Sequence, residues 1–294
     1  MRFPGIIPAV TTPFDASGAV DEAALAGNVA ALLDAGVHGI VATGTMGEAG
    51  SLSGAERRTV VAAVAEAVDG RVPVIAGVSA GTPAAAIALA ADAAEAGAGA
   101  LMMLPPLGYR ADPDELVVFY RTVAAESGLP LMAYNNPEAS GVDMPAELLV
   151  RLAGEVDGVV AVKECSGDAR RIPALLNAAP GLEVLVGGDD WALEGFCAGA
   201  TGWVSGVADI APAECIALWE ACRAGELERA RELYGRLLPL ARFDMTPKLV
   251  QYFKAAMDER GFAGGDCRPP RLPLTTSEHE ALRAALAALE GVPA

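Results

Sequence analysis

The sequence predicts a (β/α)8 barrel followed by a C-terminal helical domain. Short apolar runs recur along the first 224 residues, and each is followed by a Gly-rich or polar turn and an Ala-rich helical pattern. Runs that are bounded by Gly or Pro and alternate with helices are typical of parallel strands in βα units. After residue 225 the chain continues as three amphipathic helices without strands between them. We therefore expect a catalytic barrel over residues 1–224 and a helical domain over residues 225–294.

Eight apolar runs are candidate strands of this barrel. They begin at Gly5, Gly39, Val72, Ala100, Leu129, Gly158, Leu182 and Thr201. Helix-start signals support this alternation of strands and helices. Ser53 and Glu56 have the spacing of a capping box, and Pro83 follows a candidate N-cap at Thr82. An eighth helix is expected from about Pro212. A doubly wound open sheet is the alternative, but it predicts a Gly-rich dinucleotide-binding turn after the first strand, and "PAVTTPFDASG" has none.

The composition limits the possible partners and the compartment. Hydrophobic residues make up 53% and aromatic residues 5%, which fits an Ala-rich helical coat around a β core. The net charge is −17 and no basic cluster could follow a phosphate backbone, so we expect neither nucleic acid nor a membrane as partner. The N-terminus lacks the pattern of a signal peptide. The 5 cysteines show no CxxC spacing, which predicts reduced thiols and a cytoplasmic location.

Metal and cofactor chemistry have little support in this sequence. The 2 histidines, His38 and His279, are far apart, which disfavours a Ser-His-Asp relay, a His-rich metal site and a metal-dependent aldolase. No dinucleotide-binding turn is present. We therefore expect no metal and no cofactor, and the chemistry must come from other side chains.

Lys163 is the strongest catalytic candidate. It is one of three lysines among 21 basic residues, and it ends the apolar run in "VVAVKECSGD". Lysine, unlike arginine, can lose its proton and attack a carbonyl carbon to form an iminium. At the mouth of an apolar barrel, poor solvation is expected to favour the neutral amine. The alternative is a lysine that extends outward or pairs with Glu164, although strand alternation places Glu164 on the opposite face.

Three other segments end candidate strands at the same side of the barrel, where active sites of this fold lie. Tyr134 ends the strand before Lys163 and could shuttle protons, although it could also be a packed core tyrosine. The "GTMGE" loop, residues 44–48, offers backbone N–H groups and a hydroxyl for a substrate carboxylate, although Gly-rich turns are common. In "GGDD", Gly187 and Gly188 would let the backbone approach a substrate.

In this order and spacing, "GTMGE", "YNNP", "VKECSGD" and "GGDD", with "VTTPF" near the N-terminus, resemble the motifs of the dihydrodipicolinate synthase/N-acetylneuraminate lyase superfamily. The resemblance covers essentially the whole chain. It implies the same fold, a homo-oligomer (a tetramer or a dimer) and Schiff-base chemistry on small 2-oxo acids. It makes Lys163 the Schiff-base lysine, Tyr134 the proton-relay tyrosine and Thr45 the hydroxyl of the carboxylate loop. The remaining substrate-binding positions that it implies are Gly44, Met46, Gly188 and Val204.

Three departures separate this chain from the synthases of that superfamily. Met46 replaces the second threonine of the synthase loop "GTTGE". Leu107 aligns with a relay tyrosine, and Tyr109 lies nearby but is displaced. Ala139 occupies the place of the arginine that holds the carboxylate of the second substrate. These losses argue against the synthase reaction, because a charge-assisted contact is typically worth about 1.5–3 kcal/mol.

The segments "VKECSGDARRI", "GWVSG" and "TPKLVQYFKAAMDERG" resemble more closely a branch that contains deaminases of 1-pyrroline-4-hydroxy-2-carboxylate. That reaction needs an iminium at C2, loss of the 4-hydroxyl, and ring opening with release of ammonia. We therefore expect a Schiff-base lyase of the dehydratase or deaminase type for a small 2-oxo or cyclic-imino acid. The alternatives are 4-hydroxy-tetrahydrodipicolinate synthase, which condenses pyruvate with aspartate semialdehyde, another pyruvate-dependent aldolase, and a ligand-sensing barrel without turnover.

Overall fold

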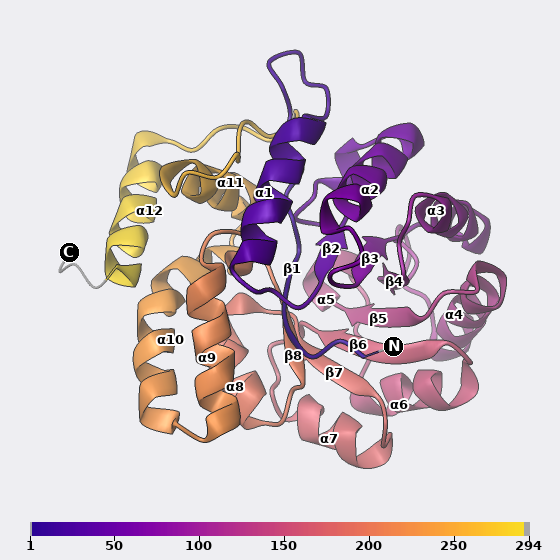
Figure 1. The fold of residues 1–294 in the computed structure, drawn as a ribbon. Helices are drawn as coiled ribbons and strands as arrows, with labels where there is room; N and C mark the ends of the chain where they lie inside the picture. Colours follow the sequence, from indigo (N-terminus) through magenta and orange to yellow (C-terminus); the bar gives the residue numbers. More distant parts are fainter. Residues whose placement is uncertain (1, 291–294) are drawn as a thin grey trace.

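The computed structural model describes residues 2–290 and contains eight parallel strands surrounded by helices (Figure 1). The strands follow the order β1-β8-β7-β6-β5-β4-β3-β2, so each strand pairs with its neighbours in the chain. A bridge between Ala9 and Val41 joins the β1 and β2 ends of this sheet and brings it to closure. The predicted (β/α)8 barrel is therefore confirmed, and the doubly wound open sheet is excluded.

Every predicted apolar run contains a strand. The strands are β1 Gly5–Pro8, β2 Ile40–Ala42, β3 Val74–Gly77, β4 Ala100–Met103, β5 Leu131–Asn135, β6 Val159–Glu164, β7 Glu183–Val186 and β8 Gly202–Ser205. The helices of the barrel are α1 Glu22–Asp34, α2 Gly54–Val68, α3 Pro83–Glu95, α4 Pro113–Ser127, α5 Pro137–Ser140, α6 Ala146–Glu155, α7 Arg171–Ala178, α8 Ala192–Cys197 and α9 Pro212–Ala224. Short 3-10 turns follow strands β2, β7 and β8: η1 Ala49–Ser51, η2 Asp189–Trp191 and η3 Val207–Asp209.

The predicted helix starts are confirmed by their hydrogen bonds. The Ser53 hydroxyl accepts from the Glu56 N–H, and the Glu56 carboxylate accepts from the Ser53 N–H, which completes the capping box of α2. Thr82 caps α3, and Pro83 occupies its first turn, where a missing N–H costs nothing. These caps fix where the chain leaves each loop and enters the outer ring of helices.

The chain after α9 forms the helices α10 Leu227–Ala241, α11 Leu249–Glu259 and α12 Thr276–Leu289, with the short turn η4 Arg242–Met245 between α10 and α11. Figure 1 shows α10 beside α9 and α12 above α10 in this view, and α11 packs against α12. The division into two domains after residue 224 stays a prediction. In residues 2–290, no helix has the length and apolar character that a membrane crossing requires.

A buried ion pair connects α11 to the loop after β2. The Lys254 ammonium donates to Glu48 Oε1 at 3.0 Å, to the Thr12 carbonyl at 2.9 Å and to the Asp266 carbonyl at 2.8 Å. The side chains of Lys254 and Glu48 are 1% and 0% exposed. Glu48 also accepts from the Arg268 N–H at 3.1 Å. This network holds the "GTMGE" loop, the segment after β1 and the C-terminal region against one another.

Replacing Lys254 is expected to destabilise the fold far more than replacing Lys248. Lys254→Met leaves the buried Glu48 without its lysine, which we expect to cost about 3 kcal/mol in the free energy of unfolding, because Arg271 still contacts Glu48. Lys248→Met removes a partly exposed pair with Glu278, which is worth at most about 1 kcal/mol. Urea unfolding of both variants measures the difference. Equal losses would show that the buried pair does not hold these segments together.

Candidate active site

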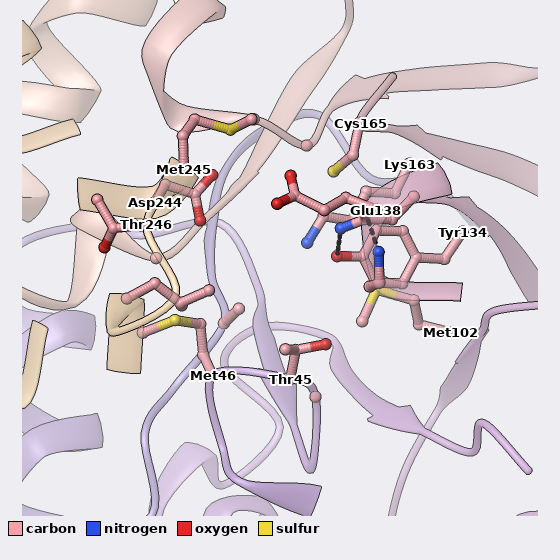
Figure 2. Close-up of a pocket in the computed structure, with 18 of the residues that line it drawn as sticks. Thr45, Met46, Met102, Tyr134, Glu138, Lys163, Cys165, Asp244, Met245 and Thr246 are labelled. Atoms are coloured by element: carbon pink, nitrogen blue, oxygen red, sulfur yellow. Dashed lines mark hydrogen bonds between the residues drawn. The ribbon is translucent and has the colours of Figure 1, made fainter. Parts of the chain in front are cut away.

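A cavity of about 260 Å³ opens at the end of the barrel where the carboxyl ends of the strands meet. Its walls come from the loop after β2, the ends of β5 and β6, the turns after β7 and β8, and η4 of the C-terminal region (Figure 2). Six of the seven predicted site residues line it: Gly44, Thr45, Met46, Tyr134, Lys163 and Gly188. The barrel therefore brings together residues that are up to 144 positions apart, from 44 to 188.

Lys163 and Tyr134 face each other on neighbouring strands. They are register partners on β6 and β5, and the Lys163 ammonium lies 4.3 Å from the centre of the Tyr134 ring. Both side chains are buried. The Asn136 amide donates to the Tyr134 hydroxyl at 2.9 Å, which fixes the orientation of the phenol. Figure 2 shows this pair at one side of the open part of the cavity.

Glu164 does not pair with Lys163. Its buried carboxylate accepts from the Asn135 amide at 3.1 Å and from the Ser166 N–H, on the side of β6 away from the cavity. The alternation that the sequence predicted is therefore correct. No residue from 2 to 290 forms a salt bridge with Lys163, so its amine remains available to the cavity.

The expected neutral state of Lys163 is wrong. Burial lowers the pKa of Lys163, the neighbouring groups of Tyr134, Cys165, Asp244 and Asp189 raise it, and the net direction is upward. The expectation counted the apolar strand and omitted these ionisable neighbours. Burial, followed by the charge of Cys165, raises the pKa of Tyr134 to about 12. The resting site therefore holds an ammonium beside a neutral phenol.

The loop after β2 is held in an unusual conformation by contacts from three directions. Thr43 and Glu48 both have positive φ angles, 54° and 53°, which non-glycine residues rarely adopt. Thr43 donates to the Gly77 carbonyl at 3.1 Å, and Thr12 donates to the Gly47 carbonyl at 2.8 Å. Lys254 holds the Glu48 end. Backbone strain of this kind persists where the surroundings over-determine the conformation, and it clusters at binding sites.

This conformation leaves backbone donors free at the cavity. The N–H groups of Glu48 and Ala49 are used within the loop, by the Thr45 and Gly44 carbonyls. Within residues 2–290, no hydrogen bond occupies the N–H groups of Thr45 and Met46. Thr45 is exposed and both residues line the cavity. Two adjacent free N–H groups form the type of concave site that binds a carboxylate.

Gly187 and Gly188 are required by close packing on the wall opposite this loop. A Cβ atom at Gly187 would overlap Cys165 Sγ and would come within 2.8 Å of Lys163 Cγ. A Cβ atom at Gly188 would overlap the Trp191 indole. Glycine at position 187 therefore leaves the lysine its path into the cavity, which is a packing reason that the sequence motif did not reveal.

The structure does not bring Val204 to the cavity wall. Val204 is fully buried in β8, and the residue of that segment on the wall is Gly206. Both residues have the same parity along the strand, so Val204 lies one layer deeper in the barrel. Sequence reasoning also missed other residues that line the cavity. They are Ala9, Met102, Asn136, Glu138, Cys165, Asp244, Met245, Thr246, Pro247 and Leu249.

Leu107 and Ala139, where the resemblance implies a tyrosine and an arginine in synthases, line the same cavity. Leu107 lines this neighbouring cavity together with Thr45 and Tyr134. Tyr109 is 49% exposed and lines neither cavity, so within this chain it does not replace that tyrosine. Ala139 lines both cavities and brings no charge.

The wall formed by η4 is acidic. Asp244 lines the cavity, and its Oδ2 atom accepts from the Asp189 N–H at 3.2 Å. Burial raises the pKa of Asp189, and the neighbouring Asp244 raises it further. Burial also raises the pKa of Asp244. Lys163 is the one cationic side chain among the residues that line this cavity.

In residues 2–290, no group of three or more His, Cys, Asp or Glu side chains is arranged to hold a metal ion.

The comparisons with known proteins agree with this geometry. Residues 2–289 match the dihydrodipicolinate synthetase family. The chain belongs to this family. The structure of dihydrodipicolinate synthase from Bacillus anthracis superimposes with a TM-score of 0.94 at 30% identity, covering 100% of both chains. The fold and the superfamily that the motifs predicted are thereby confirmed.

Curated relatives in the family are named for the synthase reaction. The 4-hydroxy-tetrahydrodipicolinate synthase of Methanopyrus kandleri is 36% identical over 291 residues, which cover 98% of this chain and 97% of the relative. That of Kineococcus radiotolerans is 40% identical over 294 residues, which cover 99% and 95%. These names match the alternative that the sequence analysis placed second, and they give no support to the deaminase branch. The chain is a Schiff-base lyase by its family.

The upward shift in the pKa of Lys163 predicts a pH dependence. Because the ammonium is the resting form and only the neutral amine attacks a carbonyl, kcat/KM should rise with pH from about 6 to 9, by up to about tenfold per unit. Initial rates at substrate concentrations well below KM measure this slope. A pH-independent kcat/KM over that range would contradict an ammonium resting state.

Proposed function

We propose that this protein is a lysine Schiff-base lyase that acts on a small 2-oxo or cyclic-imino acid by elimination, as a dehydratase or deaminase. The observation that carries the proposal is the Lys163 amine over the Tyr134 ring in a cavity whose other walls bear carboxylates and no arginine. The first half of this arrangement supplies imine chemistry. Among the described residues that line this cavity, the second half offers no arginine to anchor a second anionic substrate.

The first steps need only residues that line the cavity. The substrate carboxylate binds the free N–H groups of Thr45 and Met46, with the Thr45 hydroxyl beside it. Lys163 loses its proton and attacks C2, and the oxygen or ring nitrogen on C2 accepts a proton as it leaves. Tyr134 is a neutral phenol that Asn136 holds in place, so it can donate that proton and later recover it. The product is an iminium between Lys163 and C2.

An iminium at C2 makes elimination possible without a metal or a cofactor. The C3 proton becomes acidic, because the electron pair that remains after its removal is delocalised onto the iminium nitrogen. Departure of a hydroxyl from C4, with a proton to form water, then gives a conjugated imine. Hydrolysis frees Lys163. For 1-pyrroline-4-hydroxy-2-carboxylate, the ring opens when its nitrogen leaves C2 and remains as an amine on C5. After the elimination, tautomerisation turns this amine into an imine, and its hydrolysis by a further water releases ammonia and leaves an aldehyde at C5.

The synthase reaction is the second candidate, and the names of the relatives favour it. It shares the Lys163 imine, but it must also orient aspartate semialdehyde against the enamine. Ala139 brings no charge to that task, and Leu107 cannot relay protons. The same argument applies to another pyruvate-dependent aldolase, which must also orient a second substrate against the enamine. A ligand-sensing barrel without turnover is disfavoured, because a sensor needs neither an amine on the cavity nor an oriented phenol beside it.

The partner that this function requires is the small-molecule substrate alone. A homo-oligomer, either a dimer or a tetramer, and a cytoplasmic location stay predictions. Leu107, which lines the neighbouring cavity, and Tyr109 are exposed apolar side chains, as an interface between copies of the chain would require.

The imine predicts a covalent product on one residue. Incubation with a substrate 2-oxo acid and borohydride, in the presence of EDTA, should add the reduced substrate mass to the peptide that contains Lys163, because its amine faces the cavity. Peptide mass spectrometry locates the adduct, and Lys163→Ala is the control that should remain unmodified. An adduct on Lys248 or Lys254 instead, or a requirement for added metal, would overturn the mechanism.

The choice between the two reactions predicts a ratio of rates. We expect a larger kcat/KM for 1-pyrroline-4-hydroxy-2-carboxylate, or a related hydroxylated 2-oxo or imino acid, than for the condensation of pyruvate with aspartate semialdehyde. The physical reason is the uncharged Ala139 at the second-substrate position. Steady-state assays of both reactions on one enzyme preparation decide it. A clear preference for the condensation would establish the synthase and leave the Lys163 imine in place.

A further inference from the structure

Asp244 has no part in the steps described above, although it lines the cavity that contains Lys163. It belongs to η4, between α10 and α11, and therefore comes from the C-terminal region and not from a barrel strand. Figure 2 shows Asp244 and Glu138 on different sides of the open space in front of Lys163. A substrate that is bound through C2 to Lys163 would extend into this space.

The position of Asp244 is fixed by the backbone of the barrel. Its Oδ2 atom accepts from the Asp189 N–H at the turn after β7. Asp189 in turn is buried and accepts from the Trp203 indole at 2.9 Å and from the Val207 N–H at 2.8 Å. Within residues 2–290, no donor reaches Asp244 Oδ1. One oxygen of the carboxylate is therefore held by protein, and the other is free to accept from a molecule in the cavity.

The charges around this oxygen select among possible ligands. Lys163 is the one cation on the cavity wall, and imine formation directs it to C2 of the substrate. Glu138 adds a second carboxylate at the rim, next to the uncharged Ala139. A carboxylate at the far end of a substrate would face Asp244 and Glu138 with no compensating cation. A hydroxyl or a protonated nitrogen would instead donate a hydrogen bond to Asp244 Oδ1.

We infer that Asp244 determines specificity by accepting a hydrogen bond from the far end of the substrate. The cavity then takes 2-oxo or cyclic-imino acids whose distal end carries a hydroxyl or a protonated nitrogen, and it rejects those with a second carboxylate. This inference rests on the proposed imine at Lys163, because that bond sets the direction in which the substrate points. It adds a specificity residue from the C-terminal region to the barrel residues that perform the chemistry.

Two acids of equal length test this inference. 5-Hydroxy-2-oxopentanoate and 2-oxoglutarate differ only at C5, which is a CH2OH group in the first acid and a carboxylate group in the second. Borohydride trapping on Lys163 is measured for each acid over a range of concentrations, and the two trapping efficiencies give a preference ratio. Because both acids use the same amine, the ratio cancels effects of a substitution on Lys163 itself. Pyruvate, which has no distal group, serves as the reference.

Asp244→Asn removes the charge and keeps an oxygen that can accept from the Asp189 N–H. We expect it to lower the preference for the hydroxy acid by about tenfold or more, because juxtaposed like charges cost several kcal/mol. Trapping of pyruvate should persist. Asp190→Asn is the matched control, since Asp190 follows the same turn but does not line the cavity, and its ratio should stay within about twofold of the parent ratio. Asp244→Ser repeats the measurement with a smaller side chain if the first variant does not fold.

The outcomes separate this inference from the proposed function. If pyruvate is trapped but Asp244→Asn and Asp244→Ser leave the ratio unchanged, Asp244 is only a cap for the Asp189 N–H and the inference is wrong. An equal change in Asp190→Asn would also overturn it, since a general effect of net charge would then explain the result. If no 2-oxo acid is trapped by the parent enzyme, the proposed function fails and the inference fails with it.

Discussion

The buried ion pair between Lys254 and Glu48 connects the segments that build the cavity. Lys254 on α11 donates to Glu48 at the end of the carboxylate loop, to the Thr12 carbonyl after β1 and to the Asp266 carbonyl before α12. Two charges without access to water require such a complete set of partners. Because η4 immediately precedes α11, the same contacts that hold the loop also place Asp244 over the mouth of the barrel. The C-terminal helices are therefore part of the site.

The site combines two electrostatic environments around one amine. On the barrel side, burial keeps the Tyr134 phenol neutral, and the free N–H groups of Thr45 and Met46 can bind a carboxylate. Burial lowers the pKa of Lys163, and Tyr134, Cys165, Asp244 and Asp189 raise it to a net upward shift. On the C-terminal side, Asp244 makes the far wall acidic. One wall thus fits the anionic end of a 2-oxo acid and the other fits a hydrogen-bond donor. This asymmetry is the physical basis on which we propose elimination from a hydroxylated or imino substrate rather than condensation with a second anion.

The sequence predicted most of the barrel and its central residues, because strand periodicity and helix caps are local. Lys163 and Tyr134 were found in this way, since both end apolar runs and the carboxyl ends of parallel strands share one edge. The direction of the Lys163 pKa was predicted wrongly, because the expectation left out its neighbours Tyr134, Cys165, Asp244 and Asp189. Asp244 was missed because the position of η4 follows from long-range packing that no local pattern encodes. Val204 was wrongly predicted to line the cavity. The parity of a residue along a strand shows which face it lies on, but it does not show how deep in the barrel the residue lies.

A crystal structure of the borohydride-reduced complex with a hydroxylated 2-oxo acid tests the central claim most directly. We predict continuous density from Lys163 Nζ to C2 of the substrate, with the substrate carboxylate on the N–H groups of Thr45 and Met46. The distal hydroxyl should lie within hydrogen-bond distance of Asp244, about 2.5–3.0 Å. A substrate bound in the reverse direction, with its carboxylate toward η4, or an adduct on another lysine, would contradict this account.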